Sequence, residues 1–242
     1  MSKTYVNLEF KWGPSKFYER SKVAKEGFDA IPYVDKKTNE AKTTYHRLVD
    51  SVEGTISSVA VQETSFGRYL KVNLQTGKDE ITSISVGLDD KYGYSREAMA
   101  FISSLRGYKL GEEVSINPVV SKYTKKTGKE GMNVAFYINY KNIQGDNGKS
   151  ASTGYIDSKE IPALVEDEKL GKKTFNSDAR MQFYYDTLET IKANFSEYWD
   201  KIKADAAAKK SNDNTGTTPD SNNTKQESPV NAEPFDDDDL PF

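Results

Sequence analysis

Hydrophobic and polar positions alternate along several stretches of the chain between residues 48 and 142. In RYLKVNLQ, residues 68–75, every second position is apolar (Leu70, Val72, Leu74), which is the period-two pattern of a half-buried β-strand. Further strands are predicted at 52–61, 81–88, 112–123 and 133–142. The last two are joined by TKKTGKEG, a basic loop with glycines that predicts a hairpin.

A short helix is predicted between the third and fourth of these strands. It covers SREAMAFISSL, residues 95–105, with Ser95 as its N-cap and Gly107 near its end. Three strands, a helix and two strands is the order of a five-stranded OB barrel, although other folds share it. We therefore predict a mainly β protein with helices, in which an OB-fold barrel with an N-terminal extension occupies residues 1–150.

A longer helix is predicted from Ser177 onward, over roughly 30 residues or about 45 Å. Apolar residues recur there at alternating spacings of three and four: Met181, Tyr184, Leu188, Ile191, Phe195, Tyr198 and Ile202. Such a narrow stripe packs either along the protein's own barrel or against a second protomer, and the sequence leaves both open. We assign residues 151–210 to a helical extension.

Basic and aromatic residues occur side by side throughout the N-terminal extension and the predicted barrel. OB barrels bind oligonucleotides or oligosaccharides across their second and third strands, and single-stranded nucleic acid needs cations for its phosphates and flat rings for its bases. Seven stretches combine the two: FKW, KFYER, YHR, RYLK, KYGYSR, RGYK and SKYTKK. By alternation, Tyr69 and Tyr137 point away from the core. The predicted nucleic-acid-binding residues are Trp12, Arg47, Tyr69, Lys71, Lys122, Tyr123, Lys125, Lys126 and Tyr137.

The net charge of −3 hides a division of the chain. Residues 211–242 hold eight acidic residues against Lys225, a net charge of −7, which leaves 33 Lys+Arg and 29 Asp+Glu, or +4, for residues 1–210. The stretch from Ser211 to Pro234 offers almost nothing to bury, so we predict a disordered linker there, followed by an acidic tip. The sequence thus describes a mildly basic body tethered to an acidic end.

The tip itself, DDDDLPF, predicts a docking peptide. An acidic run alone serves solubility, but an exposed terminal phenylalanine favours association. The phenyl ring would fill a pocket on a partner while the carboxylates meet Lys and Arg around it. The predicted partner-docking residues are Asp236, Asp237, Asp238, Asp239, Leu240, Pro241 and Phe242.

The run of aspartates followed by Leu240, Pro241 and Phe242 resembles the C-terminal tip of single-stranded DNA-binding proteins of bacteria and their phages. The resemblance is close over the last ten residues and general over the linker and barrel. It implies sequence-independent binding of single-stranded DNA, protection of exposed strands, and recruitment of replication, recombination and repair proteins by the tip. The N-terminal extension and the region 151–210 depart from the compact bacterial form and favour a phage-encoded one. A tetramer is not carried over, and a homo-oligomer stays open.

Catalysis is not expected. The chain has no cysteine and one histidine, His46, and it lacks a phosphate-cradling glycine-rich loop. We predict no catalytic residue, metal or cofactor, no signal peptide or membrane span, and a cytoplasmic protein, in the host cytoplasm if phage-encoded. The alternatives are an RNA-binding or strand-annealing OB-fold protein and, from another class, a protein-interaction module with an acidic effector tail.

Overall fold

The computed structural model describes residues 3–35, 37–90, 93–124, 128–145, 148–169 and 172–213. The chain divides into two units, Met1–Tyr198 and Trp199–Phe242. The first unit contains all the strands, the helix α1 (Arg96–Leu105) and the first part of the helix α2 (Asp178–Asp213). The described part of the second unit is the remainder of α2, whose described side chains after Asp200 are all exposed.

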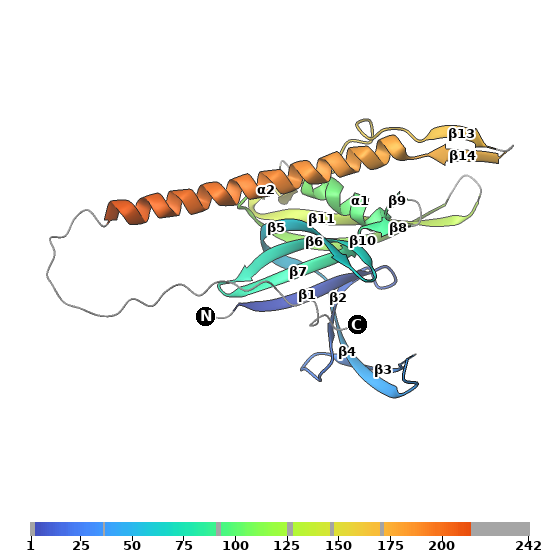
Figure 1. The fold of residues 1–242 in the computed structure, drawn as a ribbon, viewed down its shortest axis with the longest axis horizontal. Helices are drawn as coiled ribbons and strands as arrows, with labels where there is room; N and C mark the ends of the chain where they lie inside the picture. Colours follow the sequence, from blue (N-terminus) through green and yellow to red (C-terminus); the bar gives the residue numbers. More distant parts are fainter. Residues whose placement is uncertain are drawn as a thin grey trace. The chain divides into compact units, whose positions relative to one another are not determined.

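Ten strands form one mixed sheet, in the order β12-β11-β10-β5-β6-β7-β1-β2-β4-β3 (Figure 1). They are β1 (Thr4–Lys11), β2 (Lys16–Ser21), β3 (Asp29–Val34), β4 (Ala41–Val49), β5 (Val52–Thr64), β6 (Gly67–Gly77), β7 (Glu80–Gly87), β10 (Glu113–Thr124), β11 (Glu130–Gln144) and β12 (Ser150–Ser152). Two small antiparallel pairs stand apart from this sheet: β8 (Asp89–Asp90) with β9 (Gly93–Tyr94), and β13 (Val165–Lys169) with β14 (Lys172–Asn176).

The predicted strand–helix order is confirmed. Strands β5, β6 and β7 precede α1, and β10 and β11 follow it, with β8 and β9 as two-residue additions. The Oγ atom of Ser95 accepts a hydrogen bond from the backbone N–H of Ala98 at 3.0 Å, which is the N-cap that the sequence predicted. Along β6, Leu70, Val72 and Leu74 are fully buried, as their alternation required.

The five-stranded barrel predicted from the sequence is not closed by backbone hydrogen bonds among the described residues. The sheet is open, because the edge of β7 is taken by β1, which runs parallel to it with Leu8 opposite Ile84. Phe136 of β11 instead meets Phe10 of β1 (ring centroids 5.3 Å apart) and Phe17 of β2 (6.2 Å). The β1–β2 hairpin therefore joins β7, with which β1 pairs through the backbone, to β11, which it contacts through side chains.

A polar contact ties the same hairpin to β10. The Oγ atom of Ser15, in the β1–β2 turn, accepts a hydrogen bond from the backbone N–H of Val120 at 2.7 Å and lies 3.4 Å from the carbonyl oxygen of Pro118, to which it donates. On the other side of Phe136, the ring of Phe101 from α1 stacks at 4.5 Å. Phe136 is thus the point where β1, β2, β11 and α1 meet.

The N-terminal extension is built from strands that the sequence did not predict. In β1 Leu8 is buried, in β2 the three consecutive residues Phe17, Tyr18 and Glu19 are buried, and all six residues of β3 are exposed. In Figure 1 the β3–β4 hairpin projects away from the rest of the sheet. Charged residues interrupt the apolar pattern of these strands, so the sequence favoured an extension outside the barrel rather than part of its sheet.

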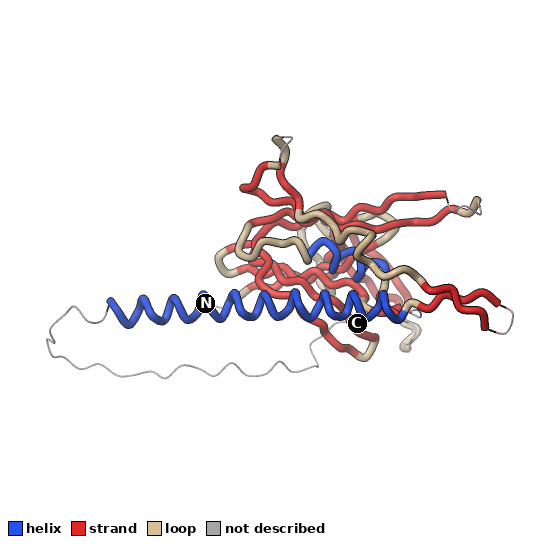
Figure 2. Tube along the Cα trace, turned by 90° about the horizontal axis from the view of Figure 1, so that it is seen from above, coloured by secondary structure: helices blue, strands red, loops and turns tan. Residues whose placement is uncertain are grey.

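In the part of α2 that belongs to the first unit, the apolar stripe is buried against the rest of the same chain. Figure 2 shows α2 as one uninterrupted helix that begins beside the β13–β14 hairpin. Tyr184, Leu188, Ile191 and Phe195 are buried, and the ring of Phe195 stacks on Tyr108 with centroids 5.8 Å apart. Gly111 has a positive φ of 87°, and a side chain there would overlap the Tyr198 hydroxyl. Own-chain packing therefore accounts for this part of the stripe.

We predict that Leu188→Ala lowers the free energy of unfolding by about 2–5 kcal/mol, because a buried leucine leaves a cavity when it is truncated. Leu188 is 1% exposed. Urea unfolding followed by circular dichroism measures the change, and Asn194→Ala, at an exposed position of the same helix, is the matched control. If Leu188→Ala retained wild-type stability but halved the sedimenting mass, the stripe would instead be a contact between protomers.

Candidate nucleic-acid interface

One side of the sheet faces away from the core along β6, β7, β1 and β2, and we call it the outer face. It is made by the side chains on the side of these strands opposite Leu8, Phe17, Leu70 and Ile84, although two of them, Tyr18 and Ser83, are themselves buried by neighbouring side chains. Its central row follows the pairing register from Lys71 to Ser85, Glu9 and Tyr18. Next to this row a satisfied polar network lies on the outer face: Asn73 donates to Ser58 at 2.8 Å and accepts from Ser83 at 2.5 Å.

Lys71 is the central cation of this row. Its side chain is only partly exposed, and among the described residues no carboxylate forms an ion pair with it. Burial alone lowers the pKa of its ammonium group from the ordinary value. A half-buried and unpaired lysine is destabilising for the folded protein, so an anionic ligand at this position would compensate it.

Tyr69 precedes Lys71 on the same face and lines a small cavity. The cavity measures about 130 Å³ and is bounded also by Glu9, Phe10 and Glu97. The indole N–H of Trp12 donates to the carboxylate of Glu97, and its ring lies edge-on to Phe10 with centroids 5.8 Å apart. The structure therefore brings Tyr69 and Trp12 near the same cavity, although Trp12 comes from the β1–β2 turn.

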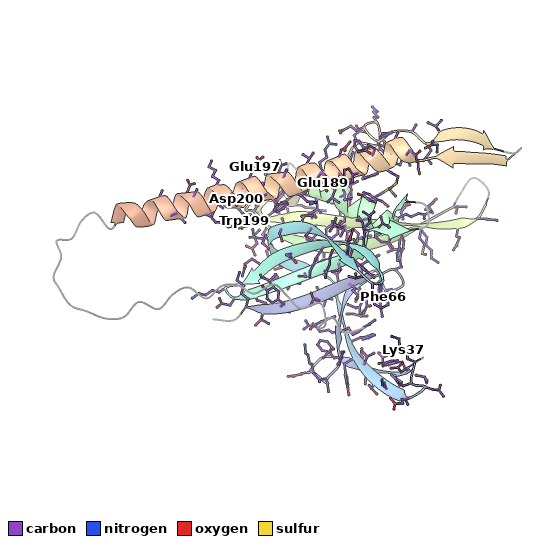
Figure 3. The ribbon with its side chains drawn as sticks, in the orientation of Figure 1. Lys37, Phe66, Glu189, Glu197, Trp199 and Asp200 are labelled. Atoms are coloured by element: carbon purple, nitrogen blue, oxygen red, sulfur yellow. The ribbon has the colours of Figure 1, made fainter. Side chains whose placement is uncertain are left out.

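An exposed aromatic residue that is not among the predicted binding residues precedes Tyr69 by three positions in the chain. Phe66, labelled in Figure 3, lies in the two-residue turn between β5 and β6 and is 66% exposed. The turn is fixed by the hydroxyl of Thr64, which accepts from the N–H of Phe66 at 3.2 Å and donates to the carbonyl of Gly67 at 3.0 Å. The sequence signal was an apolar residue in the stretch between two predicted strands, 52–61 and 68–75.

Tyr123 and Tyr137 also point away from the core, on the β10–β11 hairpin. Tyr137 lies opposite Asn117 and Tyr123 opposite Gly131, and both positions alternate with the buried ones. They are 38% and 42% exposed, respectively. Tyr137 makes an edge-on contact with Tyr155 at 5.8 Å, so one side of its ring is occupied by its own chain.

Two of the predicted cations lie on the other side of the sheet. Lys122 pairs with Met132 in the register and lies 3.7 Å from Glu130, on the face opposite Tyr123. Arg47 is held at 2.7 Å by Glu19, a buried carboxylate, with its guanidinium 5.4 Å from the ring centroid of Phe28. The structure therefore does not bring Lys122 and Arg47 together with Tyr69 and Lys71.

A basic cluster on β1 and β2 extends the outer face. The ring of Tyr18 is covered by the ammonium group of Lys11, 4.1 Å from its centroid, and its hydroxyl accepts from Arg20 at 3.3 Å. The same hydroxyl donates to Glu9, and the ring of His46 lies 5.4 Å away. The stretches FKW and KFYER carried this signal, but the sequence reasoning left them outside the barrel.

The remaining predicted residues, Lys125, Lys126 and Asp236–Phe242, lie outside the described residues. Within the described ranges no three histidine or acidic side chains come together as a metal-binding group. A search of the same ranges for a helix long and apolar enough to span a membrane finds none.

Comparison with known proteins finds no matching family model, no matching curated sequence and no matching solved structure.

The protonation of Tyr18 gives a prediction about stability in alkali. Burial, together with the hydrogen bond to Glu9, raises the pKa of Tyr18 from 10.0 to about 12. The folded protein holds this proton more tightly than the unfolded chain, so its stability should fall as the pH rises from 10 towards 12, by at most about 1.4 kcal/mol per pH unit for this group.

In Tyr18→Phe this part of the pH dependence should disappear. Urea unfolding at about pH 9 and about pH 11 measures it, and Tyr5→Phe, which replaces an exposed tyrosine of the same strand pair, is the control. An identical loss of stability in Tyr18→Phe and wild type would show that Tyr18 does not retain its proton.

Proposed function

We propose that this chain binds single-stranded DNA without sequence specificity and recruits replication, recombination and repair proteins through its acidic C-terminal tip. Exposed strands would be protected from hairpin formation and nucleases by being covered. The observation that carries the proposal is the outer face of β6. There Lys71, which has no ion-pair partner among the described residues, shares the face with Tyr69, and the turn with the exposed Phe66 begins the strand.

The strand order supports an OB-type architecture for this body. The five strands β11-β10-β5-β6-β7 are neighbours in that order, and numbered along the chain they read five, four, one, two, three. This is the Greek-key order of the partly open OB barrel, with α1 between the third and fourth strands. In that fold, the second and third strands and the loop between the first and second bind oligonucleotides. Here these are β6, β7 and the turn that carries Phe66.

The chemistry of this face fits a single strand rather than a particular sequence. Lys71 provides a cation for a phosphate, and Tyr69 and Phe66 provide rings on which bases of any kind stack. The polar network of Ser58, Asn73 and Ser83 uses its hydrogen-bonding groups internally, so little is left to read base edges. Tyr123 and Tyr137 would extend the stacking surface along β10 and β11.

Fluorescence titration with oligo-dT and oligo-rU of increasing length, at two salt concentrations, tests the function. We expect tight binding of oligo-dT that weakens with salt as phosphate contacts are lost. Equal affinity for oligo-rU would support an RNA-binding or annealing protein instead. Binding of neither polymer would overturn the proposal and leave a protein-interaction module.

Two single changes locate the binding face. Phe66→Ala and Tyr69→Ala should each weaken oligo-dT binding by about 1–3 kcal/mol, the range for loss of one base–aromatic stack. Val165→Ala, which truncates a 61% exposed apolar side chain on β13, should bind oligo-dT as wild type does. Wild-type affinity in both aromatic variants, with unchanged melting, would place the interface elsewhere.

The tip gives a separate prediction. Deleting residues 233–242 should abolish capture of partner proteins and strengthen oligo-dT binding, or leave it unchanged, most visibly at low salt, because a tethered anion no longer competes with phosphates. Phe242→Ala should abolish capture while changing oligo-dT affinity little, since it keeps every aspartate. Pull-down of purified replication proteins measures capture, and wild-type capture by Phe242→Ala would mean that the aspartates act alone.

A further inference from the structure

We propose that Lys11 and Arg20, on either side of Tyr18, form a second phosphate subsite for the same single strand, outside the five strands of the OB-type arrangement. We call Lys11, Tyr18, Arg20 and His46 the Tyr18 subsite. The inference rests on the proposed function and extends it, because it assigns the N-terminal strands β1, β2 and β4 a direct part in binding.

The geometry of the Tyr18 subsite is set by the sheet. Lys11, Tyr18 and His46 come from three neighbouring strands, and the pairing places Tyr18 opposite Glu9 and Arg20 opposite His46. Lys11 covers one side of the Tyr18 ring at 4.1 Å, while Arg20 lies 5.8 Å from the ring centroid and donates to the hydroxyl at 3.3 Å. Tyr18 thus holds both cations on the outer face.

These two cations differ from their neighbours in having no carboxylate partner among the described residues. Lys16 lies 2.8 Å from Asp50, Lys42 lies 2.6 Å from Asp35, and Lys25 and Arg47 share Glu19. The nearest acid of the subsite, Glu9, accepts from the Tyr18 hydroxyl and forms no ion pair with Lys11 or Arg20. Two cations without an ion pair among the described residues, against the single carboxylate of Glu9, therefore lie at one place on the N-terminal strands.

The subsite is continuous with the face that binds DNA in the proposed function. The register row runs from Lys71 on β6 through Ser85 and Glu9 to Tyr18 on β2. Three strand spacings separate Lys71 from Tyr18, or about 14 Å along the sheet. A flexible single strand that lies on Lys71 can therefore place a later phosphate between Lys11 and Arg20.

The imidazole of His46 can serve as an NMR probe of the Tyr18 subsite. Its Nε2 atom is buried and has no hydrogen-bond partner among the described residues. Burial, and then the charges of Lys11 and Arg20, lower its pKa from 6.5, while Glu9 opposes them. Tyr18 packs against its ring and Asp29 is its register partner on β3. Because His46 is the only histidine of the chain, its imidazole resonances need no assignment.

The first experiment measures the salt dependence of oligo-dT binding. In full-length Lys11→Met/Arg20→Met, the slope of log affinity against log salt should become shallower by about 1.4, because two phosphate contacts are lost at about 0.7 each. Lys16→Met, on the same hairpin but already paired with Asp50, should keep the wild-type slope. Lys11→Arg/Arg20→Lys keeps both charges and should also keep the wild-type slope. This control therefore distinguishes loss of charge from loss of packing on Tyr18.

The second experiment follows His46 by NMR during titration with oligo-dT. The pKa of His46 should rise on saturation, because a bound phosphate offsets the two charges that hold it down. The subsite would be overturned if the His46 resonances did not change and Lys11→Met/Arg20→Met kept the wild-type salt slope. In that case binding of oligo-dT by the wild-type protein would still support the proposed function. If the wild-type protein does not bind oligo-dT, both proposals fail.

Discussion

The packing of Phe136 against rings from three other elements holds this structure together. The hydrogen-bonded order of the sheet leaves β7 and β11 unpaired with each other among the described strands. Phe10, Phe17 and Phe101 each contact the ring of Phe136 on β11. Closure by side chains does not require the matched strand tilt and stagger that backbone closure of a barrel imposes. The β1–β2 hairpin can therefore join the core and still run on into β4 and β3.

This manner of closure has a consequence for the surface. Because β1 pairs with β7 in parallel, its outward residues continue the outer face of β6 and β7 rather than starting a new one. Phe10 and Phe17 lie on the core side of the hairpin. Lys11, Tyr18 and Arg20 lie on its outer side. Because the apolar residues of the hairpin point toward the core, Lys11 and Arg20 lie on the same face of the sheet as Lys71.

The sequence predicted what depends on local periodicity and missed what depends on distant pairing. Leu70, Val72 and Leu74 alternate cleanly, and Ser95 caps α1, so these features followed from a few neighbouring residues. The parallel pairing of β1 with β7 joins residues more than 70 positions apart and leaves no local signal. The same distinction applies to the candidate site. Alternation correctly placed Tyr69 and Tyr137 on the outward side of their strands. Lys122 was grouped with Tyr123 because the two are adjacent in sequence, but neighbouring side chains of a strand point to opposite faces of the sheet.

The pairing of charges, more than their number, distinguishes the cations proposed to bind DNA from the other cations of the N-terminal strands. Most cations of the N-terminal strands already have a carboxylate within ion-pair distance, so binding DNA would first require them to give up that partner. Lys11, Arg20 and Lys71 have none among the described residues, and Lys71 is half-buried as well. Holding an unpaired charge in partial burial costs stability in the unbound protein. A bound polyanion would neutralise such a charge, which is why the proposed binding face is centred on these residues.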